Sequence, residues 1–290
     1  MAQDEEVAAL KNKITELEQL LQSKNMEVMT YRQELAKFSQ ALDRLMVQIS
    51  GDMPMLAKVQ KAITPTELPT IPGFEISRKF VYGTQSGGDY FDVFEHEDKF
   101  RFGLLVASSS GYAMSALFLS LILKISHVLE AKKGTPPDRI MQQIAEDLKP
   151  LAGPNDVTHA FYAVIDRRDY TLKFCSAGSI GAYYMSPGKS LQTLKSSLSP
   201  FGQYFAGQLS CASIELDPRS RVCIVTGGLT DVLGEEQIVK IINDTAKAGV
   251  HDLRNELLFQ AQKKTNLVEP LRDQTVVVID VKDRVIKLAK

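Results

Sequence analysis

Residues 104–117 read LLVASSSGYAMSAL, and the change of pattern inside this stretch decides how the rest of the chain is interpreted. The apolar run 104–107 is typical of a buried strand, and from Ala113 the apolar residues recur at helical spacing. Proteins often place reactive groups where a strand turns into a helix. Here the turn carries no charged side chain. Its polar side chains are the hydroxyls of Ser108, Ser109, Ser110 and Tyr112.

Strands and helices are predicted in groups on either side of this turn. Short runs rich in β-branched and aromatic residues predict strands at 74–82, 90–95, 100–107, 160–166, 172–176, 181–185, 212–216, 221–226 and 275–281. Apolar residues at helical spacing predict helices at 113–130, 137–148, 235–246 and 252–264. Because helices come in pairs between groups of strands, the pattern favours an α+β sandwich of two sheets flanked by helices over a parallel βαβ sheet.

The N-terminal region carries a heptad pattern without any glycine or proline between residues 7 and 49. In alternating steps of three and four, the seam residues are Val7, Leu10, Ile14, Leu17, Leu21, Lys24, Val28, Tyr31, Leu35, Phe38, Leu42, Leu45 and Ile49. Only Lys24 is not apolar, and the pattern predicts a long coiled-coil helix. One helix cannot bury this seam alone, so we expect a homodimer. The alternative is that the helix packs on its own globular domain.

Glycine and proline residues divide the chain into three predicted parts. Gly51 and Pro54 end the heptad helix, and Pro65, Pro69 and Pro72 predict an extended connector. We therefore expect a coiled coil at 1–50, a linker at 51–72 and a folded domain at 73–290.

The composition does not favour a strongly charged partner. The chain has 290 residues, 44% of them hydrophobic, and a formal net charge of -1, which gives no reason to expect nucleic acid or an anionic membrane as partner. No secretory signal opens the sequence, and the apolar run around 116–123 is too short to span a bilayer. Cys175, Cys211 and Cys223 are expected to be buried, reduced thiols of a cytoplasmic protein.

Seven motifs follow one another in a characteristic order. They are LPTIPGFEISRKF at 68–80, SGGDYFDVF at 86–94, LLVASSSGYAMSAL at 104–117, AFYAVIDRRDYTLKFCSAGS at 160–179, SPFGQ at 199–203, IVTGGLTDV at 224–232 and RDQTVVVIDV at 272–281. In this order they resemble the SpoIIE/RsbU-type phosphatases, bacterial members of the metal-dependent serine/threonine phosphatase (PPM) class. The resemblance covers roughly residues 57–281. It implies a PPM-type α-β-β-α sandwich with a site for two Mn²⁺ or Mg²⁺ ions at one edge between the sheets.

The same resemblance implies that the metal site has lost its acids. Ser108 stands where the family's D-V-S-G-H-G motif begins with a metal-bridging aspartate. Gly227 replaces a second metal-binding aspartate, in T-D-G-x-T-E, and Arg272 replaces a third, in D-D-x-T. Two adjacent divalent cations need several carboxylates, because otherwise they repel each other. A catalytic two-metal centre is therefore not expected, and neither is a bound Mn²⁺ or Mg²⁺ cofactor.

Some site residues of the family are kept, and others are changed. The GGD motif is intact as Gly87, Gly88 and Asp89, and Asp273 lies beside the position that Arg272 takes. Tyr112 and Ser179 stand where the family has histidines. Asp89 is a residual candidate for one weakly held cation. Equally, it is a structural acid that accepts hydrogen bonds from backbone amides.

Other chemistry at the same motifs is less favoured. A serine nucleophile needs a general base within reach, and none of the four histidines, His96, His127, His159 and His251, lies at an expected motif. Gly227 and Gly228 lack the spacing of a phosphate-binding loop, so we interpret them as a tight turn.

The sequence thus predicts a dimeric, cytoplasmic pseudophosphatase that acts as a regulatory binding protein in a bacterial partner-switching or related phospho-signalling pathway. As the resemblance implies, a STAS-domain or other signalling protein is the expected partner. Two alternatives stay open: an active phosphatase with an altered metal site, and a scaffold whose coiled coil is the active part.

The vacated site has two possible roles in this interpretation. In the first, Arg272 and the hydroxyls of Ser108, Ser109, Ser110 and Tyr112 bind an acidic or phosphorylated side chain. In the second, Arg272 pairs with Asp89 or Asp273 and fills the vacated space.

Overall fold

The computed structural model describes residues 17–26, 28–29, 31–33, 68–84, 88–110, 128–195, 199–207 and 209–283. The chain divides into two compact units, Met1–Asp52 and Met53–Lys290.

The first unit contains a helix with exposed apolar side chains. Residues 17–26, 28–29 and 31–33 are helical. Four of the predicted apolar seam residues lie in it, and all are exposed: Leu17, Leu21, Val28 and Tyr31. The seam residues Leu10, Ile14, Leu35, Phe38, Leu42 and Leu45 lie outside the described residues, so the coiled coil stays a prediction.

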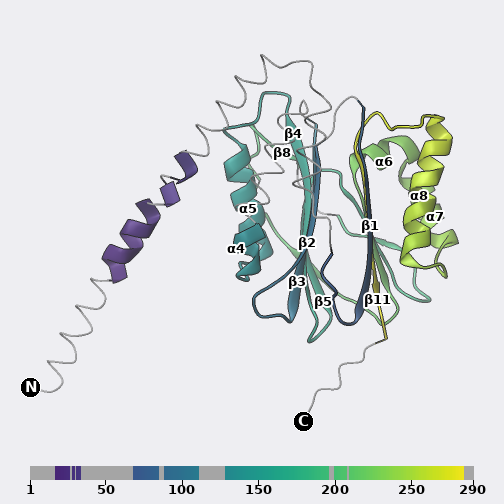
Figure 1. Ribbon diagram of the computed structural model, residues 1–290, viewed down its shortest axis with the longest axis horizontal. Coiled ribbons are helices and arrows are strands. Elements are labelled where there is room, and N and C mark those ends of the chain that lie inside the picture. The colour runs from purple at the N-terminus through teal and green to yellow at the C-terminus, as the bar shows by residue number, and fades with distance from the viewer. Residues whose placement is uncertain are drawn as a thin grey trace, which may run out of the picture. The chain divides into compact units, whose positions relative to one another are not determined.

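In the second unit, the described strands form two antiparallel sheets that pack face to face (Figure 1). The first sheet has the strand order β1-β11-β10-β6-β7, and the second has the order β2-β3-β4-β5-β9 with β8 beside β4. The first sheet comprises β1 (Phe74–Val81), β6 (Gly181–Met185), β7 (Gln192–Thr193), β10 (Arg221–Val225) and β11 (Gln274–Val281). The second comprises β2 (Asp89–Glu95), β3 (Arg101–Ser109), β4 (Val157–Asp166), β5 (Thr171–Ala177), β8 (Phe201–Gly202) and β9 (Ala212–Glu215).

Helices cover the outer faces of both sheets (Figure 1). The second sheet is covered by α4 (Val128–Lys132) and α5 (Pro137–Leu148), and the first by α6 (Gly227–Leu233), α7 (Glu235–Asp244) and α8 (Val250–Thr265). This order of layers confirms the predicted α+β sandwich.

The layering explains the long apolar runs in the sequence. In β11, Val277 and Ile279 join the core between the sheets, whereas Val276 and Val278 pack under α6, α7 and α8. A third core lies between the second sheet and α5, where Ile140 is fully buried. Because both faces of a central strand are buried, its apolar residues do not alternate with polar ones.

Most predicted elements are confirmed, some of them to the residue. The strand 181–185 and the helix 137–148 have the predicted bounds. Helix 113–130 is described only from α4 onward, and its earlier residues lie outside the described ones, as do Gly87, Tyr112 and His127. None of the described helices has the length and apolar character needed to cross a membrane.

Two predictions are wrong. Gly227 and Gly228 do not form a tight turn but open helix α6. The sequence does not predict this helix, because it is short and begins with two glycines. Apart from proline, glycine has the lowest helix propensity of all residues.

The second error concerns the cysteines. Cys175 and Cys211 form a disulfide with a Cα–Cα distance of 4.5 Å, while Cys223 is a free, buried thiol. Phe174 on β5 pairs with Ala212 on β9, and this register places Cys211 directly opposite Cys175. The bond was not predicted because 36 residues separate the two cysteines and only the strand pairing brings them together.

Candidate functional site

The ends of three neighbouring strands carry a row of polar residues. Asp89 opens β2 and pairs in register with Ser108 on β3, and Ser108 pairs with His159 on β4. Directly paired residues in an antiparallel sheet have their side chains on one face. The row lies on the face that meets the first sheet, as shown by the hydrogen bonds that the hydroxyls of Thr226 and Thr275 donate to Asp89.

Asp89 is the buried centre of this row, with 3% of its surface exposed. Its Oδ2 accepts hydrogen bonds from the hydroxyls of Thr226 and Thr275, the latter at 2.8 Å. Burial, and then the charge of Asp273, raise the pKa of Asp89 to about 7, while hydrogen bonds from Ser108, Thr226 and Thr275 act in the opposite direction. This acid is therefore held by hydroxyl groups of the chain itself.

Asp273 connects the backbones of two segments. Its Oδ1 accepts a hydrogen bond from the backbone nitrogen of Gly83 at 2.7 Å, and its Oδ2 accepts one from the backbone nitrogen of Asp89 at 3.3 Å. The carboxylate is almost completely buried. Since both oxygens bind backbone amides, Asp273 fixes the start of β2 against the end of β1.

Arg272 forms an ion pair with Asp231, and the two side chains are 38% and 57% exposed. The structure thus contradicts the alternative in which Arg272 pairs with Asp89 or Asp273. The reason is helix α6, which places Asp231 four residues after Gly227, on the same side of the helix. A β-carbon built on Gly227 would lie 3.5 Å from Nη2 of Arg272, so the guanidinium occupies the space beside this glycine.

His159 belongs to the site, although no sequence motif predicts it there. Its Nδ1 accepts a hydrogen bond from the backbone nitrogen of Ser179 at 3.0 Å, and the hydroxyl of Ser179 is 3.4 Å away. Burial and the charge of Arg272 lower the pKa of His159, against the influence of Asp231. Only the register of β3 and β4 reveals this histidine, and a single sequence does not show that register.

The row does not form a catalytic Ser–His–Asp relay. In such a relay the histidine lies between the acid and the serine. Here Ser108 lies between Asp89 and His159, and Asp89 Oδ2 is bound by two threonines.

The neighbouring serines differ in their surroundings. Ser109 is buried and alternates to the opposite face of β3 from Ser108. Ser110 is exposed, and its hydroxyl donates to the backbone oxygen of Val157 at 3.2 Å and accepts from the backbone nitrogen of Val157 at 3.1 Å. Of the three serines, only Ser108 shares a face with Asp89.

The residues present do not fit a pair of divalent cations. Among the described residues, no group of three or more His, Cys, Asp or Glu side chains is placed to hold a metal ion. Ser108 and Gly227 offer no charge, Arg272 is itself a cation, and Asp89 and Asp273 accept hydrogen bonds from the chain. Mg²⁺ and Mn²⁺ favour oxygen ligands with negative charge, and this set supplies too few.

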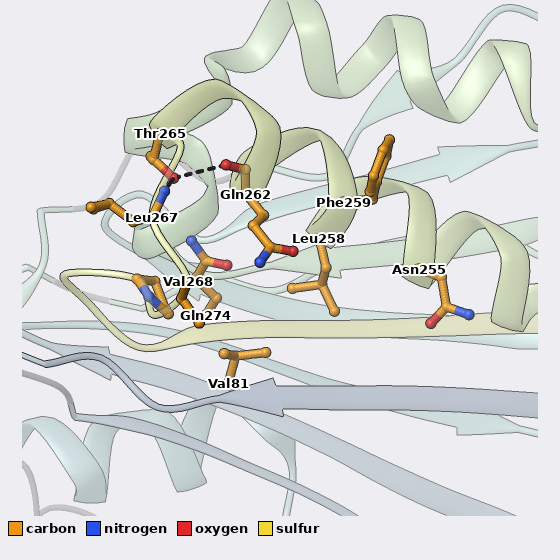
Figure 2. Close-up of a pocket in the computed structure, with 10 residues that line it drawn as sticks. Val81, Asn255, Leu258, Phe259, Gln262, Thr265, Leu267, Val268 and Gln274 are labelled. Carbon is orange, nitrogen blue, oxygen red and sulfur yellow. Dashed lines mark hydrogen bonds between the residues drawn. The ribbon is translucent and has the colours of Figure 1, made fainter.

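A groove lies next to the loop that leads to Arg272. It is lined by Val81, Leu258, Phe259, Val268 and Pro270, among others. Figure 2 shows Leu258 pointing from α8 toward Val81 on β1, with Val268 on the loop beyond the helix. Phe259 is 55% exposed and Val268 is 90% exposed, so apolar groups of the groove face solvent.

Solved structures of bacterial phosphatases have the same fold. The SiaA-PP2C domain of Pseudomonas aeruginosa is 18% identical with a TM-score of 0.66, and the match covers 81% of this chain and 98% of that one. The RsbU and RsbW domains of a Mycobacterium tuberculosis protein are 16% identical with a TM-score of 0.63, over 76% of this chain and 63% of that one. A SpoIIE fragment from Bacillus subtilis, with its PP2C phosphatase domain and part of its regulatory domain, is 14% identical with a TM-score of 0.61, over 74% and 64%.

The chain thus spans less than two thirds of the last two structures. No curated protein matches the sequence. Residues 98–282, however, match the family described as stage II sporulation protein E (SpoIIE). The chain belongs to the SpoIIE family and has the fold of PPM-type serine/threonine phosphatase domains.

Proposed function

We propose that the chain is a pseudophosphatase, a SpoIIE-type domain that binds a signalling protein and does not hydrolyse its phosphate. The observation that carries this proposal is the Arg272–Asp231 pair beside Gly227. A guanidinium repels divalent cations, and a glycine side chain offers them no ligand. The remaining acids, Asp89 and Asp273, already accept hydrogen bonds from hydroxyl and amide groups of the chain.

The proposed partner is a STAS-domain or related signalling protein in a bacterial partner-switching pathway. One similar structure holds RsbU and RsbW domains in one protein, which supports a signalling context. The exposed apolar side chains of Val268 and Leu271, which shortly precede Arg272 in the chain, support a protein partner, because exposed apolar groups are common in protein interfaces. The proposed place of action is the cytoplasm.

The N-terminal helix is proposed to join two copies of the chain as a coiled coil. Support comes from the heptad pattern and from the exposure of Leu17, Leu21, Val28 and Tyr31 in a single chain. The dimer would present two SpoIIE-type domains to the partner.

Turnover by the full chain tests the pseudophosphatase proposal. The substrates are a phosphoserine peptide and para-nitrophenyl phosphate, each with Mn²⁺ or Mg²⁺, and a metal-dependent phosphatase of this class serves as the positive control. We expect no phosphate release above the rate without protein. Metal-dependent release that is lost in Asp89→Asn would instead support an active enzyme with an altered metal site.

A second role for Arg272 is favoured by its 38% exposure, which leaves the guanidinium within reach of an incoming anion. In this role Arg272 would bind a phosphoserine side chain of the partner, which would stay uncleaved. Arg272→Ala would then weaken binding of a phosphoserine peptide by at least about fivefold, which corresponds to about 1 kcal/mol. If the variant binds the peptide as tightly as the wild type, Arg272 has only the structural role of occupying the space beside Gly227. Arg219→Ala, an exposed arginine paired with Asp283, is the matched control.

A further inference from the structure

A pocket lies on the opposite face and at the opposite end of the second sheet from Asp89 and Ser108. We call it the His96 pocket and define it by His96, Arg101, Gly134, Val164, Thr171 and Lys173. Its strand residues share the α5 face of the sheet, because Arg101 is in register with Asp166 and Thr171, and Val164 with Lys173. The cavity volume of about 290 Å³ is near the lower end of the range for small-molecule pockets.

His96 is the first unusual group in this pocket. It is only 3% exposed, yet neither of its ring nitrogens has a hydrogen-bond partner among the described residues. Burial, and then the charge of Arg101, lower the pKa of His96 to about 4, so the ring is neutral at pH 7 and has one donor and one acceptor nitrogen. Buried polar groups in proteins are almost always hydrogen-bonded, so a missing partner calls for an explanation.

The surrounding residues hold this ring in place. Its ring stacks on Phe94 with centroids 5.8 Å apart, and Phe94 stacks on Tyr162 at 6.3 Å. Gly103 permits the stack, because a β-carbon there would lie 2.5 Å from the Phe94 ring and 3.3 Å from His96 Nε2. The hydroxyl of Tyr162 also has no hydrogen-bond partner among the described residues.

The acids around the pocket already have partners within the chain. Asp98 accepts from the backbone nitrogen and Nε of Arg101, Asp166 pairs with Arg168, and Asp169 accepts from the backbone nitrogen of Thr171. Asp98 and Asp166 are thus paired with arginines, while Asp169 binds a backbone amide.

The hydrogen-bond donors of Arg101 and Lys173 have fewer partners than the acids. Among the described residues, Lys173 has no ion pair, and the Asp98 contacts of Arg101 use its Nε and backbone nitrogen rather than its two Nη groups. Gly134, with a φ of +92°, lets the turn before α5 approach these groups, since a β-carbon there would lie 3.1 Å from Nη2. The unused capacity of the pocket is therefore for hydrogen-bond acceptors with negative charge, and Val164, Pro136 and Pro137 add an apolar wall.

We propose that the His96 pocket binds a small organic anion, whose charged group lies between Arg101 and Lys173 and accepts a hydrogen bond from His96, and whose carbon body packs on Val164 and the two prolines. The charged group is a carboxylate or a phosphate ester, and both offer the same acceptor chemistry. The pocket is separate from the vacated metal site and does not depend on the proposed function.

Calorimetric titration of the full chain tests this with three probes of similar shape: benzoate, phenyl phosphate and the neutral benzamide. We expect one saturable site per chain for benzoate or phenyl phosphate, and the tighter of the two identifies the charged group. Benzamide should bind at least about tenfold more weakly, because it lacks the charge-assisted hydrogen bonds.

Variants locate the site. Arg101→Gln should weaken binding of the tighter probe at least about tenfold, and His96→Phe, which keeps the ring stack but removes the nitrogens, should weaken it as well. Arg219→Gln and Arg272→Gln should leave it unchanged. The proposal is overturned if none of the probes binds saturably, if benzamide binds as tightly as the anions, if Arg101→Gln binds like the wild type, or if Arg272→Gln abolishes binding.

Discussion

The guanidinium of Arg272 lies beside Gly227, where a β-carbon on residue 227 would be 3.5 Å from Nη2. The resemblance to SpoIIE-type phosphatases assigns a metal-binding aspartate to each of these two positions. In this chain one position has no side chain and the other carries a cation that reaches over it and pairs with Asp231. The absence of a side chain at residue 227 thus leaves room for the guanidinium of Arg272 beside the start of α6.

The two glycines at the start of α6 should respond differently to alanine. Gly227→Ala places its β-carbon at ordinary contact distance and should be neutral or stabilise by up to about 1 kcal/mol through helix propensity. In Gly228→Ala the β-carbon would lie 2.0 Å from the backbone oxygen of Asp273, so we expect a loss of about 2 kcal/mol or more. Denaturant unfolding of both variants measures the difference. Equal stabilities would argue against the close approach of α6 to residue 273.

Removal of one hydroxyl from Asp89 should be costly. Thr275→Val keeps the shape of the side chain but removes the 2.8 Å hydrogen bond to the buried Oδ2. We expect the free energy of unfolding to fall by about 1–3 kcal/mol, the range for hydrogen bonds to charged or buried groups. Thr193→Val, on the half-buried strand β7, is the control and should change stability by less than about 0.5 kcal/mol. If both variants are equally stable, Thr275 does not hold Asp89.

The sequence was sufficient to predict the α+β sandwich, because the apolar pattern of each strand reflects whether one or both of its faces are buried. The strand 181–185 and the helix 137–148 were predicted with their observed bounds. What the sequence could not give were relationships set by strand register or by a short helix. His159 enters the site through its pairing with Ser108, and Cys175 meets Cys211 through the pairing of β5 with β9. Asp231 reaches Arg272 only because 227–233 is helical.

The stability of the domain should depend on the charge state of His96. Its pKa is lowered to about 4 in the folded chain, below the usual value of 6.5, so the folded state binds a proton less readily than the unfolded state. The stability gained from the neutral, buried ring is therefore complete above about pH 6.5 and is lost as the pH falls toward about 4. Between these values, the free energy of unfolding should fall more steeply in the wild type than in His96→Phe. Identical pH profiles would show that His96 is not buried as a neutral ring.

The exposed seam of the N-terminal helix predicts a parallel dimer in solution. The double substitution Leu17→Asp and Leu21→Asp would bury charge in the seam of a coiled coil, so the variant should be monomeric while the SpoIIE-type domain stays folded. Sedimentation equilibrium gives the mass, and circular dichroism verifies the fold. A double substitution at exposed positions outside the seam, Glu18→Asp and Gln22→Asp, should remain dimeric. A monomeric wild-type chain at micromolar concentrations would contradict the coiled coil.

The most direct test of the proposed loss of the metal site is calorimetric titration of the full chain with Mn²⁺ and Mg²⁺, alongside the single variant Ser108→Asp. We expect no binuclear site in either protein. One added carboxylate leaves Arg272 in place to repel the ions, and Gly227 still offers no ligand. Two ions bound per wild-type chain with micromolar affinity, and lost on Asp89→Asn, would contradict the account.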